Sequence, residues 1–138
     1  MSEDTRIVTT ALDAYNRRDI AAVLEFLHPE VELRTVRAVL EGSVYRGHDG
    51  FKQFLRDMEE DWREFSLELD DLSDVGGGRV LVLGRLRALG RASGVELDAP
   101  AAWVCSLRDG KVAGVDFYAD EQAAREAIAA SQQSEHLP

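Results

Sequence analysis

The sequence predicts a small α+β domain in which a curved antiparallel sheet packs against three N-terminal helices and is followed by a short C-terminal helix. Two patterns lead to this prediction. Apolar residues recur at helical spacing in the first half of the chain, whereas most of the second half alternates with the period of a strand. Helices on one face of a curved sheet form a cone with a pocket inside. We therefore expect a protein that binds or converts a small molecule.

The length of 138 residues fits a single domain, which we expect to span residues 1–130, with a flexible tail over residues 131–138. Apolar residues make up 45% and charged residues 30% of the chain, values typical of a globular protein. A domain of this size buries about two thirds of the surface of its unfolded chain, which is enough for one hydrophobic core.

The bulk composition argues against several classes of partner. The net charge of −10 repels phosphate backbones, so we expect no nucleic acid partner. The longest apolar run, near Val80 to Leu83, is too short to cross a bilayer, and we expect no membrane association. The start Met1-Ser2-Glu3-Asp4 lacks the features of an export signal and predicts a cytoplasmic protein. A single cysteine, Cys105, excludes an internal disulfide and is interpreted as a small core residue.

Three segments carry helical patterns. Residues 3–18 form an amphipathic pattern with Tyr15 on its apolar stripe, and Asp19 can cap a second helix that ends before His28-Pro29. The strongest helical pattern starts at Asp49 and continues over five apolar residues at positions i, i+3, i+4, i+7 and i+11: Phe51, Phe54, Leu55, Met58 and Trp62.

The remaining elements follow as strands and one helix. Strands are predicted over residues 31–35, 65–70, 79–91, 95–107 and 112–118. The glycines at 76–78 supply one turn, and Asp109-Gly110 is a common dipeptide for a tight hairpin. Asp120 can cap a final helix over residues 121–130.

This order of elements resembles the SnoaL-like branch of the NTF2-like superfamily over roughly residues 5–128. The pieces that carry the resemblance are Leu27-His28-Pro29-Glu30-Val31-Glu32, Tyr45-Arg46-Gly47-His48 and Arg108-Asp109-Gly110-Lys111-Val112. The superfamily includes ketosteroid isomerases, polyketide cyclases, limonene-epoxide-type hydrolases, dehydratases and noncatalytic binding domains. The resemblance therefore implies the NTF2-like cone and a homodimer formed through the exposed face of the sheet, but leaves the chemistry open.

The residues at the family's catalytic positions argue against steroid-type isomerisation. The resemblance aligns Ala11 with the oxyanion-binding tyrosine of the isomerases, Thr35 with the base and Trp103 with the oxyanion-binding acid. None of these can perform its role. The cyclases hold an acid in the last strand, where the same alignment gives Phe117. A slip of one residue would bring Asp116 to the pocket instead, because one slip exchanges the two faces of a strand.

The candidate ligand-binding residues are mainly apolar and aromatic: Tyr15, Leu33, Thr35, Trp62, Trp103 and Phe117. Each of the aromatic residues also fits plain core packing. No catalytic residue is assigned, and the weak candidates for acid/base chemistry are Asp116, Glu32 and Tyr15, with solvated strand positions as the alternative for both carboxylates. The strand arginines at positions 34, 37, 85 and 87 either bind an anion or pair with the abundant carboxylates.

Neither a metal nor a cofactor is expected. His28, His48 and His136 lack the spacing of metal ligands on one element, and the glycines at 76–78 lack the lysine and the helix that a phosphate-binding loop needs.

Three functions remain open. The leading hypothesis is binding of a small apolar or aromatic molecule, because the catalytic positions are lost while a set of aromatic residues suited to a pocket is present. The second is an enzyme of the cyclase, isomerase or hydrolase type with a rearranged acid/base site. The third is a noncatalytic protein-interaction domain whose pocket is filled by its own side chains.

Overall fold

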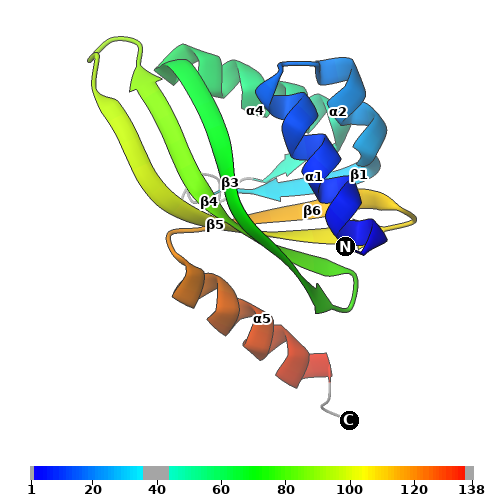
Figure 1. The fold of residues 1–138 in the computed structure, drawn as a ribbon. Coiled ribbons are helices and arrows are strands. Elements are labelled where there is room, and N and C mark those ends of the chain that lie inside the picture. The colour runs from blue at the N-terminus through cyan, green and yellow to red at the C-terminus, as the bar shows by residue number, and fades with distance from the viewer. Residues whose placement is uncertain (1, 36–43, 136–138) are drawn as a thin grey trace.

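A computed structural model describes residues 2–35 and 44–135, with side chains described up to Ser131. Arg37 and His136 lie outside the described residues. Within them, helices α1, α2 and α4 lie on one face of a six-stranded sheet, and α5 lies on the other face (Figure 1). The sheet is curved and does not close into a barrel, so the predicted α+β cone is confirmed.

The three helices on the concave side form where the sequence predicts them. Helix α1 spans Glu3–Asn16 and α2 spans Ile20–Phe26, where the Asp19 side chain accepts a hydrogen bond from the backbone N–H of Ala22 as a cap. Helix α4 spans Gly47–Asp61. Trp62 does not close this helix, contrary to the prediction, because its backbone is extended and pairs with Gly90 in the sheet. Tertiary pairing here overrides the helical spacing.

The sheet is mixed rather than purely antiparallel. Its strands are β1 Leu27–Arg34, β2 Tyr45–Arg46, β3 Trp62–Gly76, β4 Arg79–Gly90, β5 Glu96–Arg108 and β6 Lys111–Tyr118, in the spatial order β2-β1-β6-β5-β4-β3. All neighbours are antiparallel except β1 and β6, so the prediction of an antiparallel sheet is wrong at this pair. Helix α4 carries the chain to the opposite edge, and the following meander returns β6 to β1 in the same direction.

The predicted hairpin between β5 and β6 is present. Asp109 and Gly110 both have positive φ values, 56° and 74°, as the type of turn that matches the twist of paired strands requires. The return of β6 beside β1 depends on this tight turn, because a longer loop would not fix the register of the two strands.

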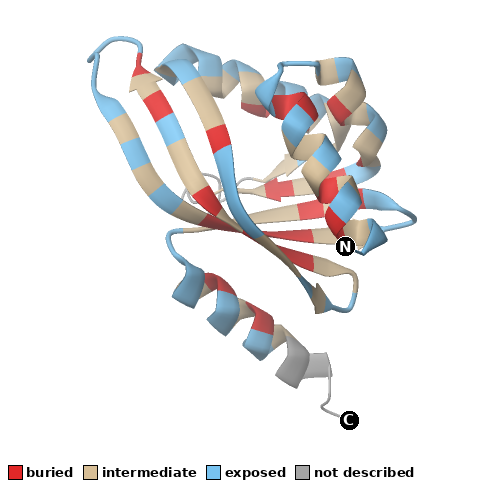
Figure 2. Ribbon diagram, viewed as in Figure 1, coloured by how far each residue is buried: buried red, intermediate tan, exposed pale blue. Residues whose placement is uncertain are grey.

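The core is divided between the two faces of the sheet. The larger cluster fills the space between the sheet and helices α1, α2 and α4, and buried residues accordingly mark the inner sides of these elements (Figure 2). A smaller cluster lies under α5 and consists of Leu81, Ala102, Val104, Ala124 and Ile128. Among the described residues, no helix has both the length and the apolar character that crossing a bilayer demands.

Helix α5 spans Glu121–Glu135 and is longer than predicted. The helix continues over residues 131–135, where the sequence predicts a flexible tail, and the flexibility of that segment stays a prediction. Residues 129–135 lack an apolar stripe, but Ala, Gln and Glu favour the helix, and their propensity extends a helix that Ala124 and Ile128 already anchor on the sheet.

Gly84 allows β3 and β4 to approach each other at a bend in the sheet. The register between these strands shifts between Leu69 and Asp71, opposite Gly84 and Leu83. A Cβ atom at position 84 would collide with the Glu68 carbonyl oxygen and would lie 3.2 Å from the Trp103 ring. The bend therefore depends on a glycine and also sets the position of Trp103.

We expect Gly84→Ala to destabilise the protein by about 1–3 kcal/mol, because either the β3 backbone or the Trp103 ring must move. Gly114→Ala is the matched control, since the added Cβ would make ordinary contacts of 3.7 Å with Ser106 and Arg34. Urea unfolding of both variants measures the difference. Equal stabilities would contradict the role assigned to Gly84.

Candidate functional site

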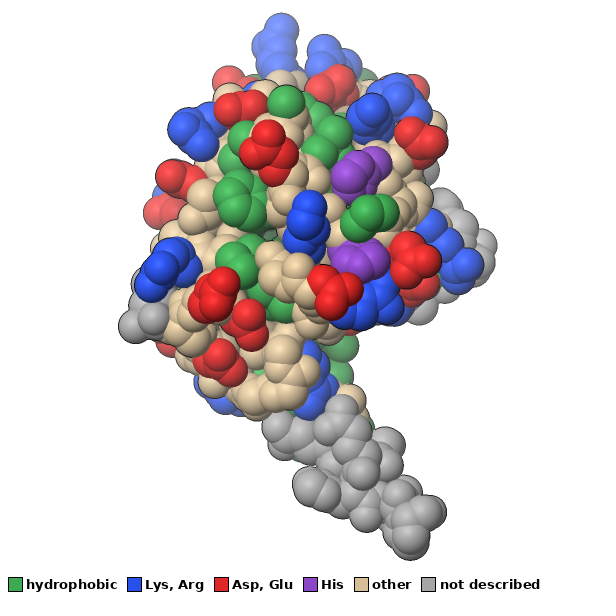
Figure 3. All heavy atoms as spheres, turned by 90° about the vertical axis from the view of Figure 1, so that its right-hand side faces the viewer, with side chains coloured by type: hydrophobic (Ala, Val, Ile, Leu, Met, Phe, Trp, Pro, Cys, Tyr) green, Lys and Arg blue, Asp and Glu red, His purple; other side chains and the backbone are tan. Residues whose placement is uncertain are grey.

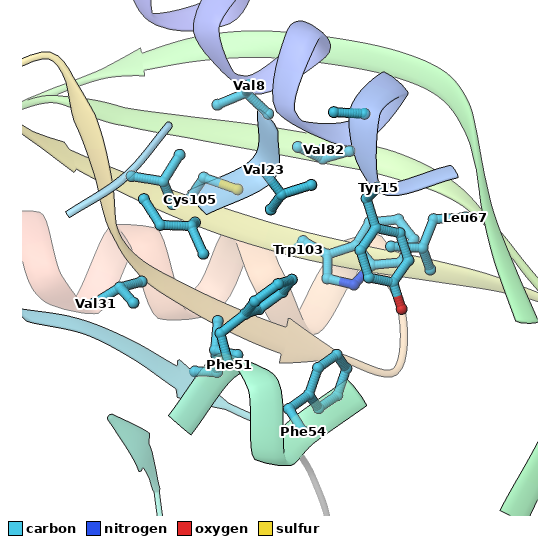
Figure 4. Packing of buried hydrophobic residues seen from close by; sticks show 14 of the residues in the cluster. Val8, Tyr15, Val23, Val31, Phe51, Phe54, Leu67, Val82, Trp103 and Cys105 are labelled. Carbon is cyan, nitrogen blue, oxygen red and sulfur yellow. The ribbon is translucent and has the colours of Figure 1, made fainter. Parts of the chain in front are cut away.

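An apolar cavity of about 90 Å³ lies between the helices and the concave face of the sheet. Its wall is built from α1, α2, α4 and five strands, and the residues that matter most below are Tyr15, Leu33, Phe51, Phe54, Trp103 and Phe117. Figure 4 shows the Tyr15 ring extending from α1 toward Trp103, and the two phenylalanines of α4 approaching from the opposite side. Apart from the Tyr15 hydroxyl, the Trp103 N–H and the Cys105 thiol, the lining side chains are hydrocarbon.

The structure brings four of the six predicted ligand-binding residues together in this wall: Tyr15, Leu33, Trp103 and Phe117. Trp62 instead lines a second hollow, of about 390 Å³, to which Tyr15 also contributes. Thr35 is not among the described residues that line either space. Sequence reasoning interpreted Phe51 and Phe54 only as helix packing, although their helical spacing already indicated that they face the sheet.

The aromatic residues of the wall contact one another in a continuous series. The ring centroids of Tyr15 and Phe51, of Phe51 and Phe54, and of Phe54 and Phe117 are each 6.4 Å apart. Trp103 and Phe117 meet edge to face at 5.9 Å. Such pairs stabilise the wall beyond simple burial and restrict the ring orientations, so the cavity has a defined shape.

Trp103, which lines the cavity, carries an unpartnered hydrogen-bond donor. Its side chain is only 3% exposed, and its Nε1 is the one buried side-chain nitrogen or oxygen of the described residues without a partner. A buried donor without an acceptor costs about 1–3 kcal/mol, so natural proteins rarely keep one. An acceptor atom on a bound molecule would recover this cost.

Tyr15 and Cys105 are both neutral at physiological pH. Burial raises the pKa of Tyr15 to about 12, although the Arg18 guanidinium opposes the change. Burial, assisted by the Asp116 charge, raises the pKa of Cys105 to about 12 as well. The phenol is therefore a hydrogen-bond donor rather than a base, and the thiol is not an activated nucleophile.

Asp116 and Glu32 lie on the opposite side of the sheet from the cavity. Val115 and Phe117 line the cavity, so the Asp116 between them projects from the other face. There Arg34 joins the two carboxylates, with Nη1 3.1 Å from Asp116 Oδ1 and Nη2 2.6 Å from Glu32 Oε2. Because of this strand register, Phe117 faces the cavity and Asp116 does not.

The same two carboxylates act on Arg34. Burial lowers the pKa of the guanidinium, but Asp116 and then Glu32 raise it, and the net change is upward. Arg34 is therefore held by the two carboxylates in an ion-pair cluster and is not available to bind an anion.

Among the described residues, the strand arginines at positions 85 and 87 and the histidines at positions 28 and 48 are also engaged with protein groups. Arg85 pairs with Asp98 at 2.7 Å and Arg87 with Glu68 at 3.0 Å. Of the two roles considered for the strand arginines, both residues therefore pair with carboxylates of the protein. His48 Nε2 lies 2.9 Å from the Leu27 carbonyl oxygen. His28 Nε2 lies 3.7 Å from Asp109 Oδ2. Figure 3 shows histidine side chains among hydrophobic, basic and acidic side chains on one face of the molecule.

Comparison with known proteins identifies the family. The model of the SnoaL-like domain matches residues 8–115, which is most of the chain. The chain therefore belongs to the SnoaL-like family, and the resemblance on which the fold prediction relied is confirmed. The fold and the apolar cavity are consistent with a family that binds small molecules. No match was found among curated protein sequences.

Solved structures with the same fold are numerous. An NTF2-like protein of unknown function from Burkholderia pseudomallei is 24% identical, with 91% of this chain and 97% of that chain covered and a TM-score of 0.77. TerC, crystallised with polyporic acid, is 24% identical over 93% and 99% of the two chains, with a TM-score of 0.76. A candidate polyketide cyclase from Xanthomonas campestris is 24% identical over 88% and 93%, with a TM-score of 0.71.

We expect the stability of the protein to fall as pH rises from about 9 to about 12. The ordinary pKa values of 9.0 for Cys105 and 10.0 for Tyr15 apply to the unfolded chain, whereas both groups stay protonated in the native state up to about pH 12. The unfolded state thus binds fewer protons in this window, and the free energy of unfolding decreases by up to about 1.4 kcal/mol per pH unit for each group.

Urea unfolding at pH 8, 9, 10 and 11 measures this slope. Cys105→Ala removes one of the two groups and should flatten the decline between pH 9 and 10, where the tyrosine contributes little. An identical slope in this variant would contradict the assignment to Cys105.

Proposed function

We propose that this SnoaL-like protein binds a small apolar molecule inside the cone and holds it by one donated hydrogen bond. The observation that carries the proposal is the unpartnered Nε1–H of Trp103 in a wall that is otherwise almost entirely hydrocarbon. An apolar occupant with a single acceptor oxygen matches both properties. Its body replaces water against the aromatic rings, and its oxygen accepts from the indole.

The size of the cavity limits its occupant. An engineered apolar cavity of about 150 Å³ holds benzene, so the 90 Å³ of this cavity suits a ring-sized group only if lining side chains rotate. Phe117 is suited to such a movement because it borders the cavity and is only partly buried, unlike the buried rings of Phe51 and Phe54. TerC was crystallised with polyporic acid, which supports a small organic molecule as the type of occupant that this fold accepts.

On this proposal the protein binds without turnover. The polar groups that face the cavity from the described residues are a phenol, an indole N–H and a thiol, and each is neutral at physiological pH. The carboxylates of Asp116 and Glu32 are held by Arg34 on the other face. We also propose that the protein acts in the cytoplasm and that it forms a homodimer; the family resemblance implies the homodimer.

The indole N–H signals of ¹⁵N-labelled protein test the proposal directly, because the chain has only 2 tryptophans. Addition of acetophenone should move the Trp103 signal downfield, since its carbonyl oxygen would accept from Nε1. Ethylbenzene has the same ring without an acceptor and should cause a smaller shift. Trp62→Phe removes the other signal and assigns the resonance.

Two variants sharpen this experiment. Trp103→Phe keeps an aromatic ring but lacks the donor and its N–H signal. Measured by calorimetry, this variant should lose affinity for acetophenone relative to the unmodified protein and lose less affinity for ethylbenzene. Asp116→Asn should bind both compounds like the unmodified protein, because Asp116 faces away from the cavity. Absence of any response of Trp103 to either compound would refute the proposed function.

A further inference from the structure

The second hollow lies on the outer side of Tyr15. It has a volume of about 390 Å³ and is lined by residues from α1, the turn into α2, the start of α2, the end of α4, β3 and the loop after β4. Tyr15 belongs to the linings of both spaces, so the apolar cavity and this hollow both border on this residue. A molecule that fills the cavity and extends past Tyr15 would therefore enter the hollow.

Positive charge predominates in the hollow. Its charged lining residues are three arginines and one glutamate: Arg18, Arg63, Arg91 and Glu59. This local excess of positive charge contrasts with the net charge of −10 of the whole chain. A concentration of guanidinium groups at an opening attracts anions and raises their local concentration.

Arg18 is fixed at this opening by contacts with neutral groups. Its guanidinium carbon lies 4.9 Å from the centre of the Tyr15 ring, a cation–π contact, and Nη1 donates to the Tyr15 carbonyl oxygen at 3.3 Å. Its Nη2 donates to the Phe65 carbonyl oxygen. Among the described residues no carboxylate pairs with Arg18, in contrast to Arg34, Arg85 and Arg87.

The backbone of Arg18 also departs from the ordinary. Its φ of 60° lies in the left-handed region that residues other than glycine, asparagine and aspartate rarely adopt. This conformation follows the end of α1 and directs the chain into α2. Arginine is disfavoured in this backbone conformation. A role for its side chain would explain why an arginine occupies the position.

We propose that the ligand is a small apolar acid whose body, with the oxygen that accepts from Trp103, occupies the cavity and whose separate anionic group binds the Arg18 guanidinium in the hollow beside Tyr15. This inference rests on the proposed function and adds the chemical class of the ligand. The Tyr15 hydroxyl stays protonated at physiological pH, so it supplies a second donor to the same anionic group. Glu59 lies in the same hollow and opposes the anion, while Arg63 and Arg91 outweigh it.

Phenylacetate and phenylacetamide test this proposal as a matched pair, because they share a ring and a side chain but differ in charge. Their affinities are measured at pH 7 and low salt by the shift of the Trp103 indole N–H signal. The unmodified protein should bind phenylacetate about fivefold more tightly than phenylacetamide, the magnitude of one partly exposed charge-assisted contact. Added salt should reduce this preference.

Three variants separate the charge of Arg18 from its structural contacts. Arg18→Gln should abolish the preference for phenylacetate and leave the affinity for phenylacetamide within about twofold, since the cavity is unchanged. Arg18→Lys keeps the charge and should retain part of the preference. Arg17→Gln is the matched control, because Arg17 contacts the Asp13 carbonyl oxygen and lines neither space.

The outcomes distinguish this inference from the proposed function. Equal affinity for the acid and the amide in the unmodified protein, or a preference that survives in Arg18→Gln, would overturn the inference while acetophenone binding keeps the proposed function intact. A loss of phenylacetamide binding equal to that of phenylacetate in Arg18→Gln would also overturn it, because Arg18 would then act only through the fold. Lack of any response of Trp103, to acids or to acetophenone, would overturn both.

Discussion

The parallel pairing of β1 with β6 is the constraint on which the candidate site depends. It sets Leu33 opposite Val115 and Arg34 opposite Asp116. Because side chains alternate along both strands, one face receives the apolar residues of the cavity wall and the other receives the ion-pair cluster of Glu32, Arg34 and Asp116. A register shift of one residue would exchange the two faces and place carboxylates inside the cone. The apolar character of the cavity is thus a consequence of register.

Polarity changes in steps from the inside of the cone to its opening. The innermost wall is hydrocarbon with one indole donor, Tyr15 presents a neutral phenol at the boundary, and guanidinium groups line the space beyond. Charged groups keep access to water at the opening, where their desolvation costs little, while neutral donors can be buried at lower cost. This arrangement suits a molecule with an apolar body and a polar end. It also explains how an acidic protein can present a local positive site.

Most of the secondary structure could be predicted because each element has its own periodicity. The pattern from Phe51 to Met58 requires a helix with one buried face, and Asp19 and Asp109-Gly110 mark a helix start and a turn by local chemistry. Trp62 was assigned to the wrong element because it extends the helical spacing by coincidence. The end of α5 was missed because propensity without an apolar stripe gives a weak signal. Three residues of the candidate site, Tyr15, Trp103 and Phe117, could be predicted from their residue type and from the family alignment.

By itself the sequence determined most of the helices and strands, that the domain is α+β, and which aromatic residue types are available to line a pocket, because these properties follow from local spacing and residue type. Only the tertiary structure decided that β1 runs parallel to β6, that Asp116 and Glu32 lie outside the cavity, and that Arg18 meets Tyr15 at its opening. The first two features join residues far apart in the chain, and the third depends on the turn between two helices. Their geometry depends on strand register and on a left-handed residue between two helices, neither of which a local pattern of residues specifies.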